Sequence, residues 1–384
     1  MKSLFSLPLI ILLFSCSGKE KSDRAQSENI LENLTYAVDT VVVDSGEDFL
    51  NLSSGIFPNG QSEDLSKLYF FESNPYKLVE VDLDDLEVLK KTEFEAEGPD
   101  GLGSYLSQLE VGPTGKHFLK SNSIIGLFDQ NARKLKNLRI VPTGIDSILA
   151  KNFSALYSKS VYDFCTQKIY SQPSFQDARD NILIIINTET KEAHSLPVPK
   201  MKIVDDYSGT YTFESEKGTM IAFHFVGSFI TLFPEEVIIS TAAFSGVYRL
   251  DIQTEELEFI DIQHQTVPNE MKVEIPENPS DPEQIRQIQN EIFQNVNFLE
   301  MLWDDTRQLY FRLGEKTFRG NSREDPITYE YYLFAYDKDF QVIGETKLEG
   351  LESNLKNMFF KEGKLWSYVN VEDELGFAVF TFDI

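Results

Sequence analysis

The feature that most constrains the fold of this chain is a unit that recurs along its whole length. The unit is clearest in Leu65–Lys91, where the apolar runs Leu68–Phe71, Leu78–Asp82 and Leu86–Lys90 are separated by Asn, Pro and Asp. Such runs predict antiparallel strands joined by tight turns. The third strand of each unit ends in an Asp or Asn corner, and these corners are Asp82, Asp129, Asn187, Asp251, Asp337 and Asp383. The chain is therefore predicted to be an all-β repeat protein.

The spacing of the repeat predicts a six-bladed β-propeller with four antiparallel strands in each blade. Propeller blades typically recur every 40–50 residues or so, whereas the corner residues lie 46 to 86 positions apart, so insertions are expected. We expect Phe49–Gly55 to begin the first blade and Met220–Phe225 to begin the fourth. Seven blades is the alternative, because about 350 residues divided by seven gives about 50 residues per blade.

The two ends of the chain predict how the ring closes. The last unit lacks a fourth strand, and Tyr36–Val43 is an isolated strand at the other end. A propeller needs its first and last blades joined, and an N-terminal strand that completes the last blade also removes an exposed edge. We therefore expect residues 35–384 to form a single propeller domain.

Two insertions interrupt the repeat. Gln263–Val296 is rich in Pro and then predicts a helix near 281–296, with Asp281 as N-cap and Pro282 at the first helical position. The apolar residues predicted to share one face of this helix are Ile285, Ile288, Ile292, Phe293 and Val296. We expect the helix to pack over the rim or face of the propeller rather than to bind a partner. Lys200–Lys217 is expected to be a long loop or an extra hairpin.

The N-terminal residues predict export and lipidation. Residues 1–15 contain Lys2 and then the apolar stretch Leu4–Phe14, which is too short to span a bilayer but suits a signal peptide. The residues before Cys16 resemble a bacterial lipobox, which predicts cleavage before Cys16 and attachment of lipid to its thiol. Residues 16–34 are polar and are expected to form a flexible tether. The alternative is an ordinary secretory signal with a chance Cys.

Charge and cysteine content exclude several classes of protein. The chain has 62 acidic and 35 basic residues and a formal net charge of −27. So acidic a domain would repel nucleic acid and anionic lipid surfaces, so no nucleic-acid partner is expected. With Cys16 lipidated, Cys165 is the only other cysteine and has no disulfide partner; we interpret it as a buried small hydrophobic residue.

Three segments resemble a known family: the lipobox at Cys16, the opening strand within Tyr36–Gly46, and the turn sequence Glu95–Tyr105. Together they are similar to the lipid-anchored β-propeller proteins of Bacteroidota that are grouped as a domain of unknown function, number 4221. The resemblance implies an outer-membrane lipoprotein that faces either the periplasm or the cell surface. It implies no functional residue other than Cys16.

No motif in the chain predicts a catalytic, cofactor or metal site. The run Gly98–Gly103 lacks the order of a phosphate-binding loop and is interpreted as a turn. No G-x-S-x-G motif is present, and adjacent acids such as Asp84 and Asp85 are expected to be solvated corners. The four His residues have no metal-ligand spacing, and a hydrogen-bonded structural role is expected for His117 and His224.

Two functions from different classes remain. The first is a monomeric, non-enzymatic module, anchored to the membrane, whose propeller binds a protein, peptide or glycan of the envelope. The alternative is a metal-dependent, Ca²⁺-type hydrolase or lactonase with its site in the central channel. A purely structural envelope component is a third reading. Three or more Asp, Glu, His or Asn side chains converging in the channel would favour the enzyme, because fold alone does not decide function.

Overall fold

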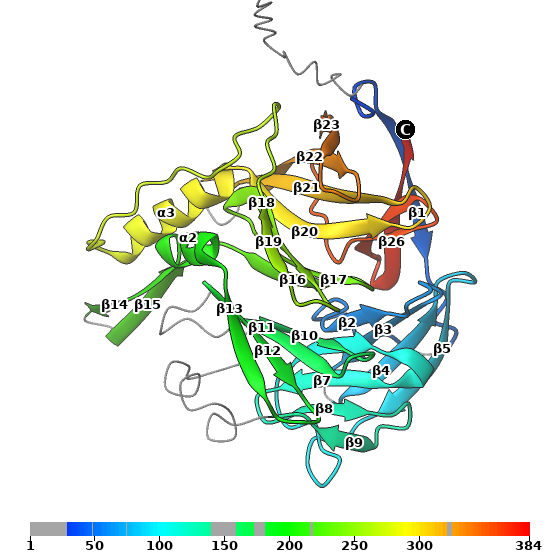
Figure 1. The fold of residues 1–384 in the computed structure, drawn as a ribbon. Helices are drawn as coiled ribbons and strands as arrows, with labels where there is room; N and C mark the ends of the chain where they lie inside the picture. Colours follow the sequence, from blue (N-terminus) through cyan, green and yellow to red (C-terminus); the bar gives the residue numbers. More distant parts are fainter. Residues whose placement is uncertain are drawn as a thin grey trace, which may run out of the picture.

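The computed structural model describes residues 29–47, 49–73, 75–139, 159–172, 181–215, 218–320 and 325–384. Within these residues, six four-stranded antiparallel sheets stand in a ring and form a six-bladed β-propeller (Figure 1). The prediction of six blades is confirmed, and the alternative of seven is wrong. The predicted signal peptide, Cys16 and the tether up to residue 28 lie outside the described residues. From Asn29 the chain is packed on the propeller, with Leu31 fully buried.

Each blade runs outward from an innermost strand at the central channel to an outermost strand at the rim. In this order, blade 1 contains β2 (Asn59–Gln61), β3 (Lys67–Glu72), β4 (Lys77–Asp82) and β5 (Glu87–Glu93). Blade 2 contains β6 (Leu106–Val111), β7 (His117–Ser121), β8 (Ile125–Phe128) and β9 (Lys134–Asn137). Blade 3 contains β10 (Lys159–Asp163), β11 (Lys168–Gln172), β12 (Ile182–Asn187) and β13 (Ala193–Pro197). Blade 4 contains β16 (Ser228–Leu232), β17 (Glu236–Thr241), β18 (Phe244–Asp251) and β19 (Leu257–Ile260). Blade 5 contains β20 (Asn297–Asp304), β21 (Leu309–Phe318), β22 (Thr328–Tyr336) and β23 (Val342–Leu348). Blade 6 contains β24 (Phe359–Lys361), β25 (Lys364–Val371), β26 (Glu374–Asp383) and β1 (Thr35–Val42).

The N-terminal strand closes the ring, as predicted. Strand β1 pairs antiparallel with β26 from Thr35 opposite Asp383 to Val42 opposite Gly376. Behind this pairing, Phe380 and Phe382 of β26 are buried in one cluster with Leu31 and with Phe311 of blade 5. The first and the last strand of the described chain therefore pair in blade 6, and β26 is left without an unpaired edge.

The corner residues explain why the third and fourth strands of a blade turn so regularly. The Asp82 side chain accepts hydrogen bonds from the backbone N–H groups of Asp84 and Asp85, at 2.8 and 2.9 Å. A residue with positive φ follows, Leu86, and the ladder shifts register beside it. This combination of a side-chain-capped turn and a left-handed residue is a compact way to reverse a strand. The corners at Asp129, Asn187, Asp251 and Asp337 accept equivalent bonds.

Two predicted strands are wrong in place or in pairing. Phe49–Gly55 is an irregular connection: Gly55 adopts a φ of +61°, Leu50 is buried in the core and Leu52 is only partly buried against it. Blade 1 begins instead at β2. Met220–Phe225 lies mostly in a strand, but this strand is β15 (Gly218–His224), which pairs with β14 (Gly209–Ser215) outside the blades. Blade 4 begins at β16. The apolar pattern indicates a strand but does not say with which strand it pairs.

The two insertions contain the predicted types of structure, a helix and an extra hairpin. Helix α3 (Pro282–Gln294) starts at Asp281, whose side chain accepts from the backbone N–H of Gln284 at 2.9 Å. Its buried residues Ile285, Ile288 and Ile292 join the core cluster of blades 3 and 4, and the helix packs against β15 and β21. The other insertion is the hairpin β14–β15, preceded by η3 (Pro199–Met201) and α2 (Lys202–Asp206); the remaining short helix is η1 (Pro113–Gly115). No helix in the described part of the chain is long and apolar enough to cross a membrane.

The propeller has two faces of different character. Because neighbouring strands are antiparallel, the connections from an outermost strand to the next innermost strand all emerge on one face. This face, called the insertion face, carries 43–58, 94–105, 198–227, 261–296 and 349–358, and therefore α2, α3 and the β14–β15 hairpin, which gather on one side of the ring in Figure 1. The opposite face, called the turn face, carries the first-to-second and third-to-fourth strand turns, none longer than five residues among the described strands.

Candidate functional site

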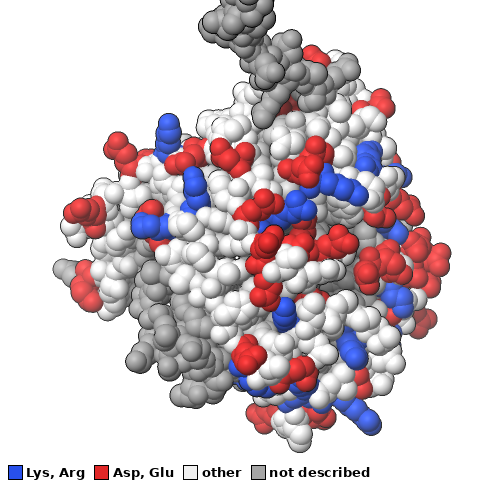
Figure 2. Space-filling view, viewed as in Figure 1, with Lys and Arg blue, Asp and Glu red and all other residues white. Residues whose placement is uncertain are grey.

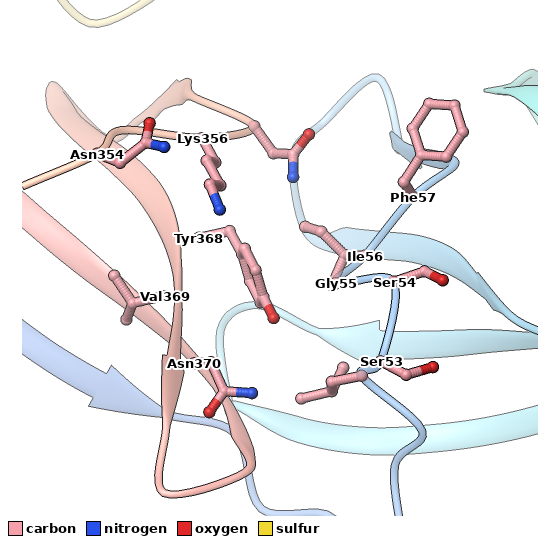
Figure 3. A pocket seen from close by; sticks show the side chains of 12 residues that line it. Ser53, Ser54, Gly55, Ile56, Phe57, Asn354, Lys356, Tyr368, Val369 and Asn370 are labelled. Carbon is pink, nitrogen blue, oxygen red and sulfur yellow. The ribbon is translucent and has the colours of Figure 1, made fainter. Parts of the chain in front are cut away.

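A hollow of about 820 Å³ opens on the insertion face between blades 1 and 6. One wall is the connection that leads into β2, and the other is the connection that leads into β24 together with β25 (Figure 3). Its volume lies in the range of known small-molecule sites, which is roughly 300–1,000 Å³. We call it the blade 1–6 pocket, and its lining residues are Leu52, Ser53, Ser54, Gly55, Ile56, Phe57, Asn354, Lys356, Asn357, Tyr368, Val369 and Asn370.

Tyr368 and Gly55 fix the shape of this pocket. Tyr368 is only 8% exposed and its ring belongs to the core cluster shared by blades 1 and 6. Gly55 needs its positive φ, and a Cβ atom there would lie 3.3 Å from Cε1 of Tyr368. The missing side chain therefore lets the chain pass close beside the ring. On the other wall, the backbone N–H of Tyr368 donates to the Lys356 carbonyl at 2.9 Å and holds that connection in place.

The polar groups of the pocket are only partly used by the protein. The Asn370 side-chain oxygen accepts from the Asp373 backbone N–H at 3.0 Å, and the Asn357 oxygen accepts from Asn59 Nδ2 at 3.1 Å. Asn354 and Lys356 make no side-chain hydrogen bond or ion pair with any described residue. In Figure 3 the Lys356 ammonium lies above Tyr368 and the Asn370 amide nitrogen is turned toward the hollow. The pocket therefore presents hydrogen-bond donors.

The charge of the pocket differs from that of the molecule. Acidic side chains are spread over the surface, with basic ones among them (Figure 2). The pocket is lined by no carboxylate and by one ammonium group, that of Lys356. The chemistry available is thus a short array of amide, hydroxyl and ammonium groups beside an aromatic ring, which suits binding and offers no nucleophile paired with a base.

Near the central channel, side chains of β6 hydrogen-bond to the backbone of β10, the innermost strand of blade 3. Gln108 of β6 donates to the Ser160 carbonyl at 2.5 Å, and the Glu110 carboxyl accepts from the Tyr162 N–H at 2.8 Å. Burial raises the pKa of Glu110 to about 8, and burial lowers the pKa of Lys120 to about 8. These residues join blades 2 and 3, so their arrangement is explained by blade packing.

The described residues contain no group of three or more His, Cys, Asp or Glu that could hold a metal ion. His117 and His224 are buried in their strands, but the ring nitrogens of His117 have no hydrogen-bond partner among the described residues, contrary to expectation. The His224 ring lies 2.9 Å from the Tyr207 carbonyl and 3.1 Å from the Tyr211 hydroxyl. Nothing in the part of the chain that the structure describes therefore favours a channel-metal enzyme.

A smaller hollow of about 380 Å³ lies on the turn face between blades 4 and 5. Its groups are engaged with one another: Glu236 accepts from Arg249 Nε at 2.5 Å and from the Tyr310 hydroxyl. The Lys338 ammonium covers the Trp303 ring at 5.6 Å from its centroid. This hollow therefore has fewer free groups than the blade 1–6 pocket.

The residues considered from the sequence lie away from this pocket. Cys165 is exposed, so the prediction that it is buried is wrong. It lies in the turn after β10 ends, where its N–H donates to the Asp163 side chain at 2.8 Å. Asp84 pairs with Lys361 at 2.5 Å, and Asp304 is buried rather than solvated. Sequence reasoning missed Lys356, Tyr368 and the three asparagines, whose only signal is a stretch poor in acids that carries several Asn.

Comparison with known proteins agrees with this architecture. The family model described as a domain of unknown function, DUF4221, matches residues 27–347. The chain belongs to this family. A crystal structure of a DUF4221 member from Bacteroides vulgatus has a TM-score of 0.64 at 12% identity and covers 93% of this chain and 99% of its own. The resemblance expected from the sequence is confirmed, although the lipoprotein character remains a prediction.

Other solved structures match with lower scores. Hydrazine synthase from Kuenenia stuttgartiensis has a TM-score of 0.41 at 13% identity, covering 86% of this chain and 78% of its own. Hsv2 from Kluyveromyces marxianus has a TM-score of 0.39 at 7% identity, covering 85% and 96%. At this level they say nothing about what the DUF4221 chain binds. No functionally curated protein matches the sequence.

Proposed function

We propose that this DUF4221 protein is a lipid-anchored propeller of the cell envelope that binds a ligand in the blade 1–6 pocket. The ligand is a protein segment, a peptide or a glycan. The observation that carries the proposal is the set of unpaired donors around a hollow of about 820 Å³, on the face where the long connections converge. Binding residues are found disproportionately on loops held by a rigid scaffold. The propeller fold itself suggests a binding module.

The anchoring part of the proposal rests on the sequence before residue 29. Cys16 would carry the lipid, and the chain between Cys16 and Asn29 would reach at most about 45 Å, at roughly 3.3–3.6 Å per residue. This length would hold a monomeric propeller close to the outer membrane, on its periplasmic or outer surface. The test is Cys16→Ser: we expect the protein to leave the membrane fraction and to lose its fatty-acyl mass. Unchanged membrane retention and mass would contradict anchoring at this residue.

Binding is tested with the full chain carrying Cys16→Ser, so that lipid does not interfere. A panel of peptides and oligosaccharides is screened by thermal shift and titration calorimetry, because a ligand that binds the native state raises its melting temperature. Asn354→Trp fills the pocket from a solvent-exposed position, and Asn131→Trp, on the turn face, is the matched control. We expect at least one ligand whose affinity falls tenfold or more with Asn354→Trp alone. If every ligand binds both variants equally well, the pocket is not the site.

A further inference from the structure

We infer that the ligand of the blade 1–6 pocket is a carbohydrate that carries carboxylate or sulfate groups. The inference rests on the proposed function and names its ligand class. Three features of the pocket support it: the direction of its hydrogen bonds, its aromatic surface and its charge.

The first feature is that the pocket offers free hydrogen-bond donors. An asparagine has one oxygen that accepts and one nitrogen that donates. The Asn370 side chain is used by the protein itself, since its oxygen accepts from the Asp373 N–H and it also hydrogen-bonds with Tyr368. The oxygen of Asn357 accepts from Asn59, which leaves the Asn357 nitrogen, together with the Asn354 amide, for a ligand. A ligand rich in acceptor oxygens, such as a sugar with its hydroxyl and ring oxygens, matches these free nitrogens.

The second feature is an aromatic surface inside a polar rim. In Figure 3 the Tyr368 ring, which is 8% exposed, stands between the two walls of the pocket, and Phe57 stands at the edge with 51% of its surface exposed. The flat C–H face of a sugar ring packs well on an aromatic ring while its hydroxyls reach polar groups at the sides. Ser53 and Ser54 add exposed hydroxyls on the wall opposite Asn354 and Lys356.

The third feature is the positive charge placed in a strongly negative protein. With 62 acidic residues in 384, a wall of 12 residues would contain about two by chance, yet none of the lining residues is acidic. The Lys356 ammonium is unpaired within the described residues. An unpaired ammonium with no nearby lining carboxylate favours a ligand anion, and the surrounding negative surface excludes anions that lack further contacts. This combination selects an anionic sugar over a simple anion or a neutral sugar.

The experiment compares matched ligands with matched variants by titration calorimetry of the Cys16→Ser chain. The ligands are an oligogalacturonate, its methyl ester, a sulfated galactan oligosaccharide and tetraglutamate. We expect an oligosaccharide with carboxylate or sulfate to bind, and its affinity to fall tenfold or more on methyl esterification or with Lys356→Gln. Lys364→Gln, an exposed change of equal charge at the other end of β25, is expected to leave affinity unchanged.

The two sugar arms distinguish a carboxylate from a sulfate as the recognised group. Equal binding of the acid and its ester, no effect of Lys356→Gln, binding of tetraglutamate alone, or no binding of either anionic sugar would each overturn the inference. Failure of the proposed function gives a different result, because Asn354→Trp would then change the affinity of no ligand in the panel. A ligand that responds to Asn354→Trp but not to Lys356→Gln keeps the pocket and rejects the anionic sugar.

Discussion

The turn face and the insertion face solve different problems with the same residue types. On the turn face, Asp and Asn side chains accept bonds from nearby backbone N–H groups, as Asp251 does from Gln253 and Thr254 at 2.9 and 2.7 Å. On the insertion face, the oxygen of Asn357 also accepts a hydrogen bond, but its amide nitrogen has no hydrogen-bond partner among the described residues and lies at a hollow. The first arrangement completes its hydrogen bonds locally, and the second leaves donors available for another molecule.

This difference predicts a separation of roles. Substitutions on the turn face should change stability and leave ligand affinity alone, whereas substitutions in the blade 1–6 pocket should change affinity. Function placed on long connections above a regular scaffold is a general expectation for folds of this kind. Variants on each face test whether stability and ligand affinity are separated in this way.

The largest effect is expected for Asp304→Ala on the turn face. Asp304 is 1% exposed, accepts from Arg307 Nη1 at 2.6 Å and caps the Thr306 N–H at 3.0 Å. Arg307 in turn donates to the Gly363 carbonyl of blade 6 at 2.5 Å. Removing one partner of a buried ion pair leaves the other uncompensated, so we expect a loss of about 3 kcal/mol in the free energy of unfolding. Urea denaturation measures it.

The control for this variant is its neighbour. Asp305→Ala removes an exposed acid from the same turn, and we expect a change within about 0.5 kcal/mol. Ligand affinity should be the same in both variants. An affinity loss with Asp304→Ala in protein that is still folded would show that the two faces are coupled through blades 5 and 6.

The next effect concerns acid stability and compares His117 at the turn face with His264 in the insertion-face connection 261–296. Burial lowers the pKa of each to about 4, while the unfolded value is about 6.5. The unfolded chain therefore binds more protons between these values, and stability falls as the pH drops from about 6.5 to 4. Each histidine contributes about 3 kcal/mol to that loss.

The two histidines differ in the hydrogen-bond partners of their ring nitrogens. The His264 ring lies 3.2 Å from both Glu345 and Tyr336, whereas His117 has no described partner. His117→Leu should shift acid unfolding to lower pH and raise stability at pH 7 by about 1 kcal/mol, because it removes buried unsatisfied polar atoms. His264→Leu should lower stability at pH 7 by a similar amount or more. The exposed His194→Gln serves as control, and an unchanged acid midpoint in His117→Leu would contradict the assignment.

A smaller effect is expected for Gly55→Ala in the blade 1–6 pocket. A left-handed backbone costs a residue with a Cβ about 1 kcal/mol, and the new methyl group would press on Tyr368 at 3.3 Å. We therefore expect a modest loss of stability together with weaker ligand binding. Gly46→Ala is the matched control, because Gly46 also has a positive φ but nothing lies near its Cβ position. Equal affinity in the two variants would show that the Tyr368 ring does not shape the site.

The sequence predicts the turn face much better than the insertion face. The side chains of Asp82 and Asp251 cap backbone N–H groups only two residues away, so these turns can be recognised from the local sequence. Because the turns recur, the strand order and the six blades can be predicted from the repeat. The closing of the ring by β1 follows too, because an unpaired edge on β26 is unfavourable. The turns depend on hydrogen bonds between residues close in the sequence, and the closing of the ring depends on the number of strands in the last blade.

The insertion face depends on contacts between distant segments. Gly55 and Tyr368 are more than 300 positions apart in the chain, and no local pattern indicates that they meet. Phe49–Gly55 has the apolar content of a strand, yet it folds irregularly: Leu50 is buried in the core and Leu52 packs partly buried against it, whereas Phe49 is 79% exposed. The pocket could therefore not be assembled from the sequence, although each of its residues is visible there.

The smallest expected effect tests whether the corners act through hydrogen-bond geometry or through charge. Asn187 fills the corner of blade 3 and accepts from Glu189 and Thr190 N–H at 2.9 and 3.0 Å, as Asp251 does in blade 4. Hydrogen bonds from Thr254 hold the pKa of Asp251 below its usual value, so the carboxylate is charged at neutral pH. Asp251→Ala should lower the melting temperature by about 2 °C, and Asp251→Asn should keep most of the stability that the alanine variant loses. If the melting temperatures of both variants fall equally, the negative charge of Asp251 stabilises this turn, and the hydrogen-bond geometry alone does not explain the corner.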